Sequence, residues 1–571
     1  MMKSRLDFPK QIWVHLIRPY WTSHEKWSAC GLLGGYLILM GIFIAVSVQL
    51  NYWHNDFYTA LQKLDINAFF KLLGIFLGWA FLSIIVFITK NYLLQTLEVR
   101  WRSWMTRHSL ETWMKNRRYY ALQLQGNGSD NPDQRISDDI SSFINISLSM
   151  MLGLFQQVIT LISFFGILWS LSGTLRFSLG GVLISIPGYM CWGAILYAVA
   201  GTFLSFYFGR GLTKLSYEHE KREANFRYSL IRFRDNSEGI AFYQGEKREQ
   251  GIFQDRFQQI NQNAYAVIKQ MLVMNSWGSF YGQWQALLPA LLAAPRFFAK
   301  EVTFGSLMQI FSAFKQVSDS LSFIITNYVG ITAWRATTVR LLEFTMSLSG
   351  ELPPATLAHV RHWEDGLEVM CDHLSLPHGG RLQENIRLSV APGDHTLISG
   401  PTGTGKSTLA RAIAGLWPYG KGEIRIPAGD FLFLPQKPYL PLGSLKEVLL
   451  YPKSEASLEE LCDGLDAVGL GSFKPRLGEV NDWARVLSLG EQQRVAILRA
   501  LLAKPHWLVM DEATSAMDEA SEAHLYGLLK QTLPETTLVS IGHRESLKTL
   551  HVQEMRLGVV AEKAAVFGVA V

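Results

Sequence analysis

The chain has 571 residues, of which 49% are hydrophobic and only 18% are charged, against roughly 25% charged in ordinary soluble proteins. This length exceeds what one hydrophobic core usually serves, so several domains are expected. The net charge of +5 is small, and basic residues in a chain with apolar spans are typical of cytoplasmic loops, so nucleic acid is not an expected partner. The four cysteines are too scattered to indicate a disulfide framework or a metal site.

The first 26 residues predict a helix in the membrane interface, because aromatic and basic residues alternate there. Residues 27–50 contain no charged residue and are long enough to cross a bilayer, which takes about 20 apolar residues in a helix. The run is too long for the apolar part of a cleaved signal peptide. A first membrane-spanning helix is therefore predicted.

Five more apolar runs predict five further spans, which gives an all-α membrane domain of six helices over 27–345. They lie at about 69–94, 144–171, 188–209, 274–298 and 305–334. Lys315 and Asp319 interrupt the last run, four residues apart on one helical face. An internal ion pair is the simplest interpretation, and contact with cargo or with a proton is the alternative.

Basic residues gather after the second and the fourth span, whereas 51–68 has only Lys63 and 172–187 has only Arg176. Basic loops stay in the cytoplasm, so both long loops and both chain ends are predicted to be cytoplasmic. The loops are polar and are predicted to continue as helices below the membrane. Further along, Ser347, Gly350 and two prolines indicate a linker over 346–360, and the alternating strands and helices of 361–571 predict an α/β domain.

A phosphate-binding loop is predicted between an apolar strand and a helix at 396–408, Thr-Leu-Ile-Ser-Gly-Pro-Thr-Gly-Thr-Gly-Lys-Ser-Thr. Glycines let backbone N–H groups turn towards phosphates, and the helix N-terminus adds partial positive charge. Lys406 is expected to reach the β and γ phosphates, and the Ser407 hydroxyl to complete a Mg²⁺ shell. The candidate ATP-binding residues here are Gly400, Gly403, Gly405, Lys406, Ser407 and Thr408.

Two adjacent carboxylates, Asp511 and Glu512, end the apolar stretch 507–510. Carboxylates at the end of a buried strand need cations or water around them. Asp511 fits a Mg²⁺ ligand, and Glu512 fits a general base that polarises the attacking water.

Four further features accompany these motifs: Gln436, the run Leu487-Ser-Leu-Gly-Glu-Gln-Gln-Arg494, the run 515–518 and His543. The whole set resembles the ATPase domain of ABC transporters. The resemblance implies that ATP on one chain is closed over by Ser488 and Gly490 of a second chain. It also implies that Gln436 senses Mg²⁺, that His543 holds the γ-phosphate and that Asp518 connects the two sites. The signature has Leu489 and Glu491 where glycine and glutamine are frequent, and Leu376 stands where an aromatic residue usually stacks on adenine, so base selectivity is expected to be loose.

The membrane half is similar to SbmA/BacA-like bacterial ABC transporters, relatives of peroxisomal acyl-CoA transporters, at 51–62, 131–136, 223–227 and 237–243. Short mixed-polarity turns in the cytoplasmic loops are expected to dock on the ATPase domain, with solvated helix faces as the alternative. The candidate coupling residues are Asp133, Gln134, Arg135 and Glu238.

The resemblance implies a homodimer in the bacterial inner membrane that uses ATP and Mg²⁺ to move a bulky polar or amphipathic solute, with uptake as the expected direction. Peptides, cobalamin-like molecules and acyl-CoA-like molecules are candidate cargoes. The alternatives are a membrane-anchored regulatory ATPase without transport and an exporter of lipid-like cargo. The fold itself sets no direction.

Overall fold

The computed structural model describes residues 8–124, 131–179, 182–350, 356–363, 366–377, 379–452 and 455–558. The chain forms two compact units. The membrane unit comprises 1–116 and 129–349, and the ATPase unit comprises 117–128 and 350–571. The linker prolines Pro353 and Pro354 lie outside the described residues.

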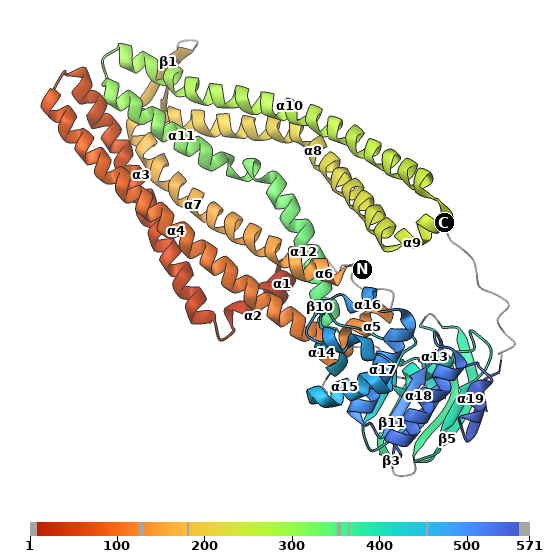
Figure 1. The fold of residues 1–571 in the computed structure, drawn as a ribbon. Coiled ribbons are helices and arrows are strands. Elements are labelled where there is room, and N and C mark those ends of the chain that lie inside the picture. Colours follow the sequence, from red (N-terminus) through yellow and green to blue (C-terminus); the bar gives the residue numbers. More distant parts are fainter. Residues whose placement is uncertain are drawn as a thin grey trace. The chain divides into compact units, whose positions relative to one another are not determined.

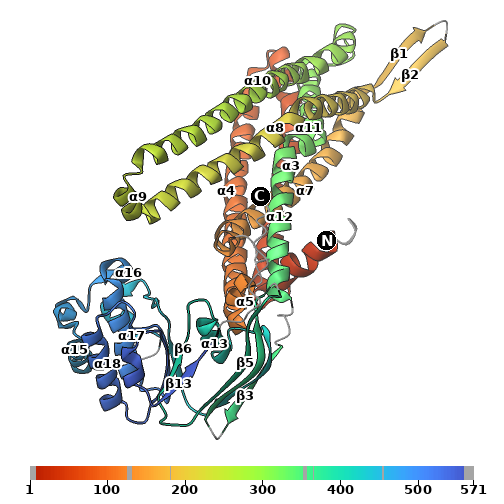
Figure 2. The same ribbon diagram turned by 90° about the vertical axis from the view of Figure 1, so that its right-hand side faces the viewer.

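The membrane unit opens with a broken helix that packs on the long helices. It consists of α1 (Phe8–Ile12), η1 (Trp13–Ile17) and α2 (Arg18–Trp21). Tyr20 is fully buried and stacks on Trp101 with ring centroids 5.4 Å apart. The antiparallel pair α3 (Lys26–Gln62) and α4 (Ile66–Met114) follows, and the two helices lie side by side in both views (Figures 1 and 2). The Asp65 side chain caps α4 by accepting hydrogen bonds from the backbone N–H groups of Asn67 and Ala68.

The rest of the membrane unit is a second set of long helices. Two short turns, α6 (Pro132–Gln134) and η3 (Arg135–Asp139), lead into α7 (Ile140–Ser172). A hairpin of β1 (Thr174–Leu179) and β2 (Val182–Pro187) projects beyond the helices before α8 (Tyr189–Asp235) (Figure 2). Helix α8 pairs with α10 (Glu246–Phe298), and the short α9 (Ser237–Tyr243) joins the two. Helices α11 (Phe304–Thr326) and α12 (Tyr328–Ser349) complete the unit.

Among the described residues, four helical stretches are long and apolar enough to cross a membrane: Lys26–Gln62, Ile66–Leu124, Pro132–Ser172 and Tyr189–Asp235. The predicted count of six depends on α10 and α11, which are long helices but are not among these four. Their polar side chains, such as Gln285 on α10 and Lys315 on α11, lower the hydropathy of the segments. The core of this unit is apolar, with Phe164, Met190 and Phe314 fully or almost fully buried.

Two sheets and a group of helices build the ATPase unit. The five-stranded parallel sheet has the order β13-β6-β12-β11-β8, with β6 (Thr396–Ser399), β8 (Phe431–Leu434), β11 (Trp507–Asp511), β12 (Thr537–Ile541) and β13 (Gln553–Arg556). The four-stranded mixed sheet has the order β3-β7-β4-β5, with β3 (Leu357–Trp363), β4 (Leu367–Ser375), β5 (Arg381–Val390) and β7 (Gly420–Pro427). A small ladder pairs β9 (Gly443–Ser444) with β10 (Val480–Asn481).

Most helices of the ATPase unit alternate with its strands along the sequence. They are α5 (Arg118–Leu124), α13 (Lys406–Ile413), α14 (Leu445–Leu450), α15 (Leu458–Ala467), α16 (Trp483–Val486), α17 (Leu489–Ala503), α18 (Glu519–Thr532) and α19 (Ser546–Thr549), with the 3₁₀ turn η4 (Gly471–Arg476). A second 3₁₀ turn, η2 (Lys115–Arg117), spans the boundary between the two units in sequence. Every residue of β6 and β12 is buried, as is usual for parallel strands covered on both faces. Because β6, β8, β11 and β12 are parallel, their carboxyl ends meet at one edge of the sheet. Such folds place their ligand site at this edge.

Candidate active site

The phosphate loop begins where β6 ends at Ser399, and α13 begins at Lys406. Gly400, Gly403 and Gly405 have φ of 147°, 81° and 91°, values that side chains disfavour. Lys406 is only 7% exposed, and its Nζ donates to the carbonyl oxygens of Gly400 at 2.8 Å and Pro401 at 2.9 Å. The loop is thus wound around a buried ammonium group. Thr408 is buried on the following turn of α13.

An oxygen donor set suited to Mg²⁺ lies beside this loop. The Ser407 hydroxyl donates to Asp511 Oδ1 at 3.1 Å, so β6 and β11 bring their polar ends together. Burial raises the pKa of the Asp511 carboxyl above its ordinary value. One hydroxyl and one carboxylate suit a hard cation that takes its other ligands from phosphate and water. The residues therefore fit Mg²⁺ bound with ATP, and the pair supplies its protein ligands when the metal is present.

Glu512 lies at the centre of a second group. Its φ is +50°, a left-handed value that is uncommon for a residue with a side chain, and its N–H donates to the Ile541 carbonyl at 2.9 Å. Gln436 Nε2 donates to Glu512 Oε2 at 2.9 Å, and His543 Nδ1 lies 3.6 Å from Oε1. The ends of β8, β11 and β12 therefore bring together the three residues predicted to act in catalysis.

Gln493 supports this group through hydrogen bonds to backbone atoms, and it was not predicted as a site residue. It is fully buried on α17, and its Nε2 donates to the Gln436 carbonyl at 2.9 Å, while its Oε1 accepts from the Ala516 N–H at 3.0 Å. It ties the backbone of Gln436 to the segment that follows Glu512. The only sequence signal for it was its place within the run 487–494.

Ser488, Gly490 and Asp518 lie at the beginnings of two helices. Ser488 caps α17 in a capping box, in which Glu491 Oε2 accepts from the Ser488 N–H at 2.8 Å. Glutamate at position 491 therefore has a structural reason, because it serves in this box as glutamine can. Asp518 caps α18 by accepting from the Ser521 N–H at 2.8 Å, and this bond lowers the pKa of the Asp518 carboxyl. A Cβ on Gly490 would lie 3.2 Å from the Ala516 carbonyl oxygen, so the two helix starts are close.

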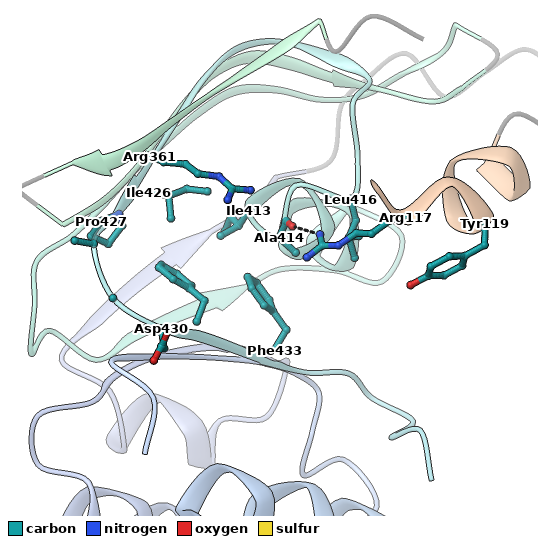
Figure 3. Close-up of a pocket in the computed structure, with 13 residues that line it drawn as sticks. Arg117, Tyr119, Arg361, Ile413, Ala414, Leu416, Ile426, Pro427, Asp430 and Phe433 are labelled. Carbon is teal, nitrogen blue, oxygen red and sulfur yellow. Dashed lines mark hydrogen bonds between the residues drawn. The ribbon is translucent and has the colours of Figure 1, made fainter. Parts of the chain in front are cut away.

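Helix α5 lies in the loop that was predicted to be helical, but its place in the ATPase unit was not predicted, since it follows the long helix α4 in sequence. Leu124 packs against the ATPase core, and Arg117 just before α5 donates to the Ala414 carbonyl at 3.1 Å, as Figure 3 shows. Tyr120 lines a cavity of about 490 Å³ together with Ser407, Gln436 and Asp511. A second cavity of about 510 Å³ lies between Arg117, Tyr119 and the strand segment 426–433 (Figure 3).

The four predicted coupling residues lie within the membrane unit. Asp133, Gln134 and Glu238 are exposed. Arg135 is buried and pairs with Asp139 at 2.6 Å, and Asp139 also binds Arg340 at 2.8 Å. The structure therefore gives Arg135 an interior partner that joins η3 to α12.

Known proteins match this chain along almost its whole length. The family described as ABC transporter transmembrane region 2 matches residues 16–298, and the family described as ABC transporter matches residues 383–515. An uncharacterized ABC transporter ATP-binding protein of Synechocystis sp. is 38% identical over 93% of this chain and 80% of its own length. ABC transporter D family member 2, chloroplastic, of Arabidopsis thaliana is 33% identical over 96% of this chain and 86% of its own length. The human lysosomal cobalamin transporter of subfamily D is 27% identical over 94% of this chain and 92% of its own length.

A solved structure shares the fold. The ATP-bound structure of a bacterial Atm1-family ABC exporter superposes with a TM-score of 0.68 and 18% sequence identity, covering 92% of this chain and 93% of that chain. Both the helical membrane unit and the ATPase unit thus have the arrangement of elements found in this fold. Family members hydrolyse ATP to drive transport, and the ATPase domain implies ATP and, generally, Mg²⁺. The chain belongs to the ABC transporter family, as a fused membrane and ATPase half-transporter related to the D-subfamily transporters.

Proposed function

We propose that two copies of this chain form a transporter in the bacterial inner membrane that uses ATP to take up a bulky polar or amphipathic solute. Peptides, cobalamin-like molecules and acyl-CoA-like molecules are the candidate cargoes. The observation that carries the proposal is the joining of Glu512, Gln436 and His543 at one sheet edge, beside a cavity that α5 also lines.

In this proposal each predicted residue has one task. Lys406 binds the phosphates, and Ser407 and Asp511 hold Mg²⁺. Glu512 takes a proton from the attacking water, since its carboxylate is held in place by the Gln436 amide and lies near the His543 ring. The Gln436 amide is held through its backbone by Gln493.

Coupling runs through α5 in this proposal. Tyr120 of α5 lines the same cavity as Gln436 and Asp511, and the proposal links the position of Gln436 to α5 across this cavity. Helix α5 follows α4 after only three residues of η2, with left-handed backbone at Asn116 and Arg117. The predicted coupling residues Asp133, Gln134 and Glu238 are exposed and available for docking, whereas Arg135 supports the local fold.

The dimer is proposed because the resemblance to ABC transporters gives Ser488 and Gly490 a role at the ATP site of a second chain. These residues start α17, and the proposal places them over the ATP of a second chain. Helix α9, between α8 and α10, also supports a dimer, because its residues Phe242 and Tyr243 are 80% and 89% exposed in a single chain. Exposed aromatic residues at a loop tip favour docking on a protein surface.

Six spans remain part of the proposal, with α10 and α11 as the two polar ones. Helices lining an aqueous path carry polar residues that lower their mean hydropathy without preventing them from crossing the membrane. Basic residues after the second and fourth spans favour cytoplasmic loops and ends.

The test is ATP-dependent accumulation of a labelled solute in proteoliposomes, with wild type set against Glu512→Gln. A labelled peptide, cobalamin and an acyl-CoA are offered in turn. We expect wild type to accumulate one of them, and Glu512→Gln to bind ATP while losing about 10²-fold or more of turnover, the usual contribution of a general base. Solute-stimulated ATP hydrolysis without any movement would support a regulatory ATPase instead, and brisk phosphate release by Glu512→Gln would refute its role.

A further inference from the structure

A polar cluster joins α10 and α11 inside the membrane unit. Lys315 Nζ donates to Asp319 Oδ2 at 2.5 Å, and Gln285 Nε2 of α10 donates to Asp319 Oδ1 at 2.7 Å. Each carboxylate oxygen therefore has its own donor. Among the described residues, the Lys315 ammonium makes no other hydrogen bond, although it has three N–H donors.

The position of this cluster along α11 places it at membrane depth. At 1.5 Å per residue, Lys315 and Asp319 lie roughly 17 and 23 Å along the helix from Phe304, within the roughly 30 Å of a hydrocarbon layer. Their side chains are 65% and 42% exposed in the single chain. Charged side chains at such depth face protein or water rather than acyl chains. In the proposed six-span arrangement, this face of α11 is therefore turned to protein or to an aqueous path and not to lipid.

Neighbouring contacts fix the cluster in place. The Tyr281 and Ser322 hydroxyls lie 3.1 Å apart and join α10 to α11. Tyr197 of α8 donates to the Tyr281 carbonyl and stacks on its ring with centroids 4.3 Å apart. Because Tyr281 lies one turn before Gln285, these contacts hold the amide that orients Asp319. The site is thus organised before any ligand arrives.

Lys315 is the more exposed member of the ion pair, with 65% of its side chain exposed against 42% for Asp319. Each Asp319 oxygen already accepts one hydrogen bond, whereas the Lys315 ammonium retains two donors that no described residue accepts. We propose that Lys315, positioned by Asp319 and Gln285, binds an acidic group of the cargo, a carboxylate or a phosphate. This inference rests on the proposed transport function and narrows its substrate class to acidic solutes.

Matched solutes test the inference with the full-length protein in proteoliposomes. One pair is an amphipathic peptide with a free C-terminal carboxylate and the same peptide as its C-terminal amide. The other pair is palmitoyl-4′-phosphopantetheine and palmitoyl-pantetheine, which differ only in the phosphate. The measurement is the concentration that gives half-maximal ATP-dependent accumulation. For wild type we expect the acidic member of one pair to need about tenfold less than its neutral partner, as a charge-assisted bond provides. The pair that shows the preference identifies carboxylate or phosphate.

Three variants separate recognition from folding. Lys315→Gln with Asp319→Asn removes both charges together, leaves no unpaired charge, and should bring the acid-to-neutral ratio close to one. Asp319→Asn alone frees the ammonium and should lower the half-maximal concentration of the acidic solute further. If the ion pair were merely structural, both variants would need a higher concentration of every solute. Lys315→Arg should keep the preference. Lys71→Gln, at an exposed lysine of α4, is the matched control and should keep the wild-type ratio.

The outcomes are distinguishable. If wild type accumulates both members of each pair equally, or the doubly neutral variant keeps the wild-type ratio, the acidic-cargo inference is wrong and transport stands. If wild type accumulates none of the four solutes and no cobalamin either, the transport proposal fails and the inference fails with it.

Discussion

At the scale of single residues, Asp511 shows how a site that fits a cation affects the rest of the fold. Its carboxyl ends a buried strand and accepts one hydrogen bond, from Ser407. Burial raises its pKa, so the folded chain holds the proton more tightly than the unfolded chain does. This group stabilises the fold at low pH, and its contribution is lost as pH rises from the ordinary aspartate range through the raised pKa.

We therefore predict that Asp511→Asn raises the melting temperature at pH 7 without Mg²⁺. Asparagine is uncharged and keeps an acceptor for Ser407. The difference from wild type should shrink as pH falls towards about 4, where the unfolded carboxyl also becomes protonated. Thermal unfolding of the detergent-purified protein from pH 4 to 8 measures this. With Mg²⁺ and ATP added, wild type should gain more stability than Asp511→Asn, which keeps Lys406 but lacks the carboxylate for Mg²⁺. A variant that melts below wild type without metal would contradict the prediction.

Local sequence predicts part of this site well and part of it poorly. The phosphate loop and the Asp511-Glu512 pair each lie within a few residues of a strand end, so the strand and its following residues indicate them directly. Gln436 and His543 follow the ends of two other strands, β8 and β12, and only the resemblance to a family placed them with Glu512. Arg135 was assigned to an interface although its partner Asp139 is only four residues away, because the second guanidinium on Asp139 comes from Arg340, 201 residues further along the chain, and the burial of the group leaves no local pattern.

At the scale of elements, the Arg135, Asp139 and Arg340 group joins the start of α7 to α12. The Asp139 side chain is 5% exposed and binds both guanidinium groups. Asp139→Ala would leave Arg135 buried without its partner, so we predict a loss of about 3–5 kcal/mol in stability. Asp138→Ala, at the exposed neighbouring residue, should change stability by less than about 0.5 kcal/mol. Melting temperatures of the two purified variants test this, and equal values would show that the buried pair contributes little.

Helix α5 gives a second prediction at this scale. Leu124 packs on the ATPase core, whereas its neighbour Gln123 is exposed. Leu124→Ala removes apolar contact worth roughly 1–2 kcal/mol and should loosen α5 without touching the nucleotide residues. We expect less solute accumulated per ATP hydrolysed, with hydrolysis itself within about twofold of wild type. Gln123→Ala is the control, and an unchanged transport ratio for Leu124→Ala would argue against coupling through α5.

No sequence signal predicted the break between α4 and α5, and the reason is physical. The break before it uses left-handed backbone at Asn116 and Arg117, not the glycine or proline that usually marks a turn. The hairpin of β1 and β2 was likewise treated as a loop, because its strands are short and lie between much longer apolar helices. The membrane unit could be divided into spans only where composition was strongly apolar, which is why α10 and α11 remain a proposal.

At the scale of the whole molecule, a dimer with shared ATP sites predicts complementation between inactive chains. Lys406→Ala removes the phosphate-binding ammonium. Ser488→Asp keeps a residue type that caps helices but adds a negative charge where the partner's phosphate would lie. Each variant alone should lose at least about 90% of ATP hydrolysis, a loss of about 1.4 kcal/mol or more in transition-state binding.

Mixing the two variants should restore activity. A mixed dimer has one site with both defects and one site with none, so hydrolysis should rise clearly above either variant alone. Ser488→Asn caps the helix without the charge and serves as the control. Mixed dimers purified through two different tags provide the measurement, and activity no greater than the average of the two variants would contradict shared sites.

The backbone conformation of Glu512 affects how this position should change under laboratory selection. Its left-handed backbone, with φ of +50°, costs of order 1–3 kcal/mol for a residue with a side chain. Glycine would relieve that cost and lose the carboxylate. Laboratory evolution of this chain for heat resistance alone should therefore enrich glycine at position 512, and evolution for growth on its cargo should remove it. The same position would then report which of the two pressures a population had experienced.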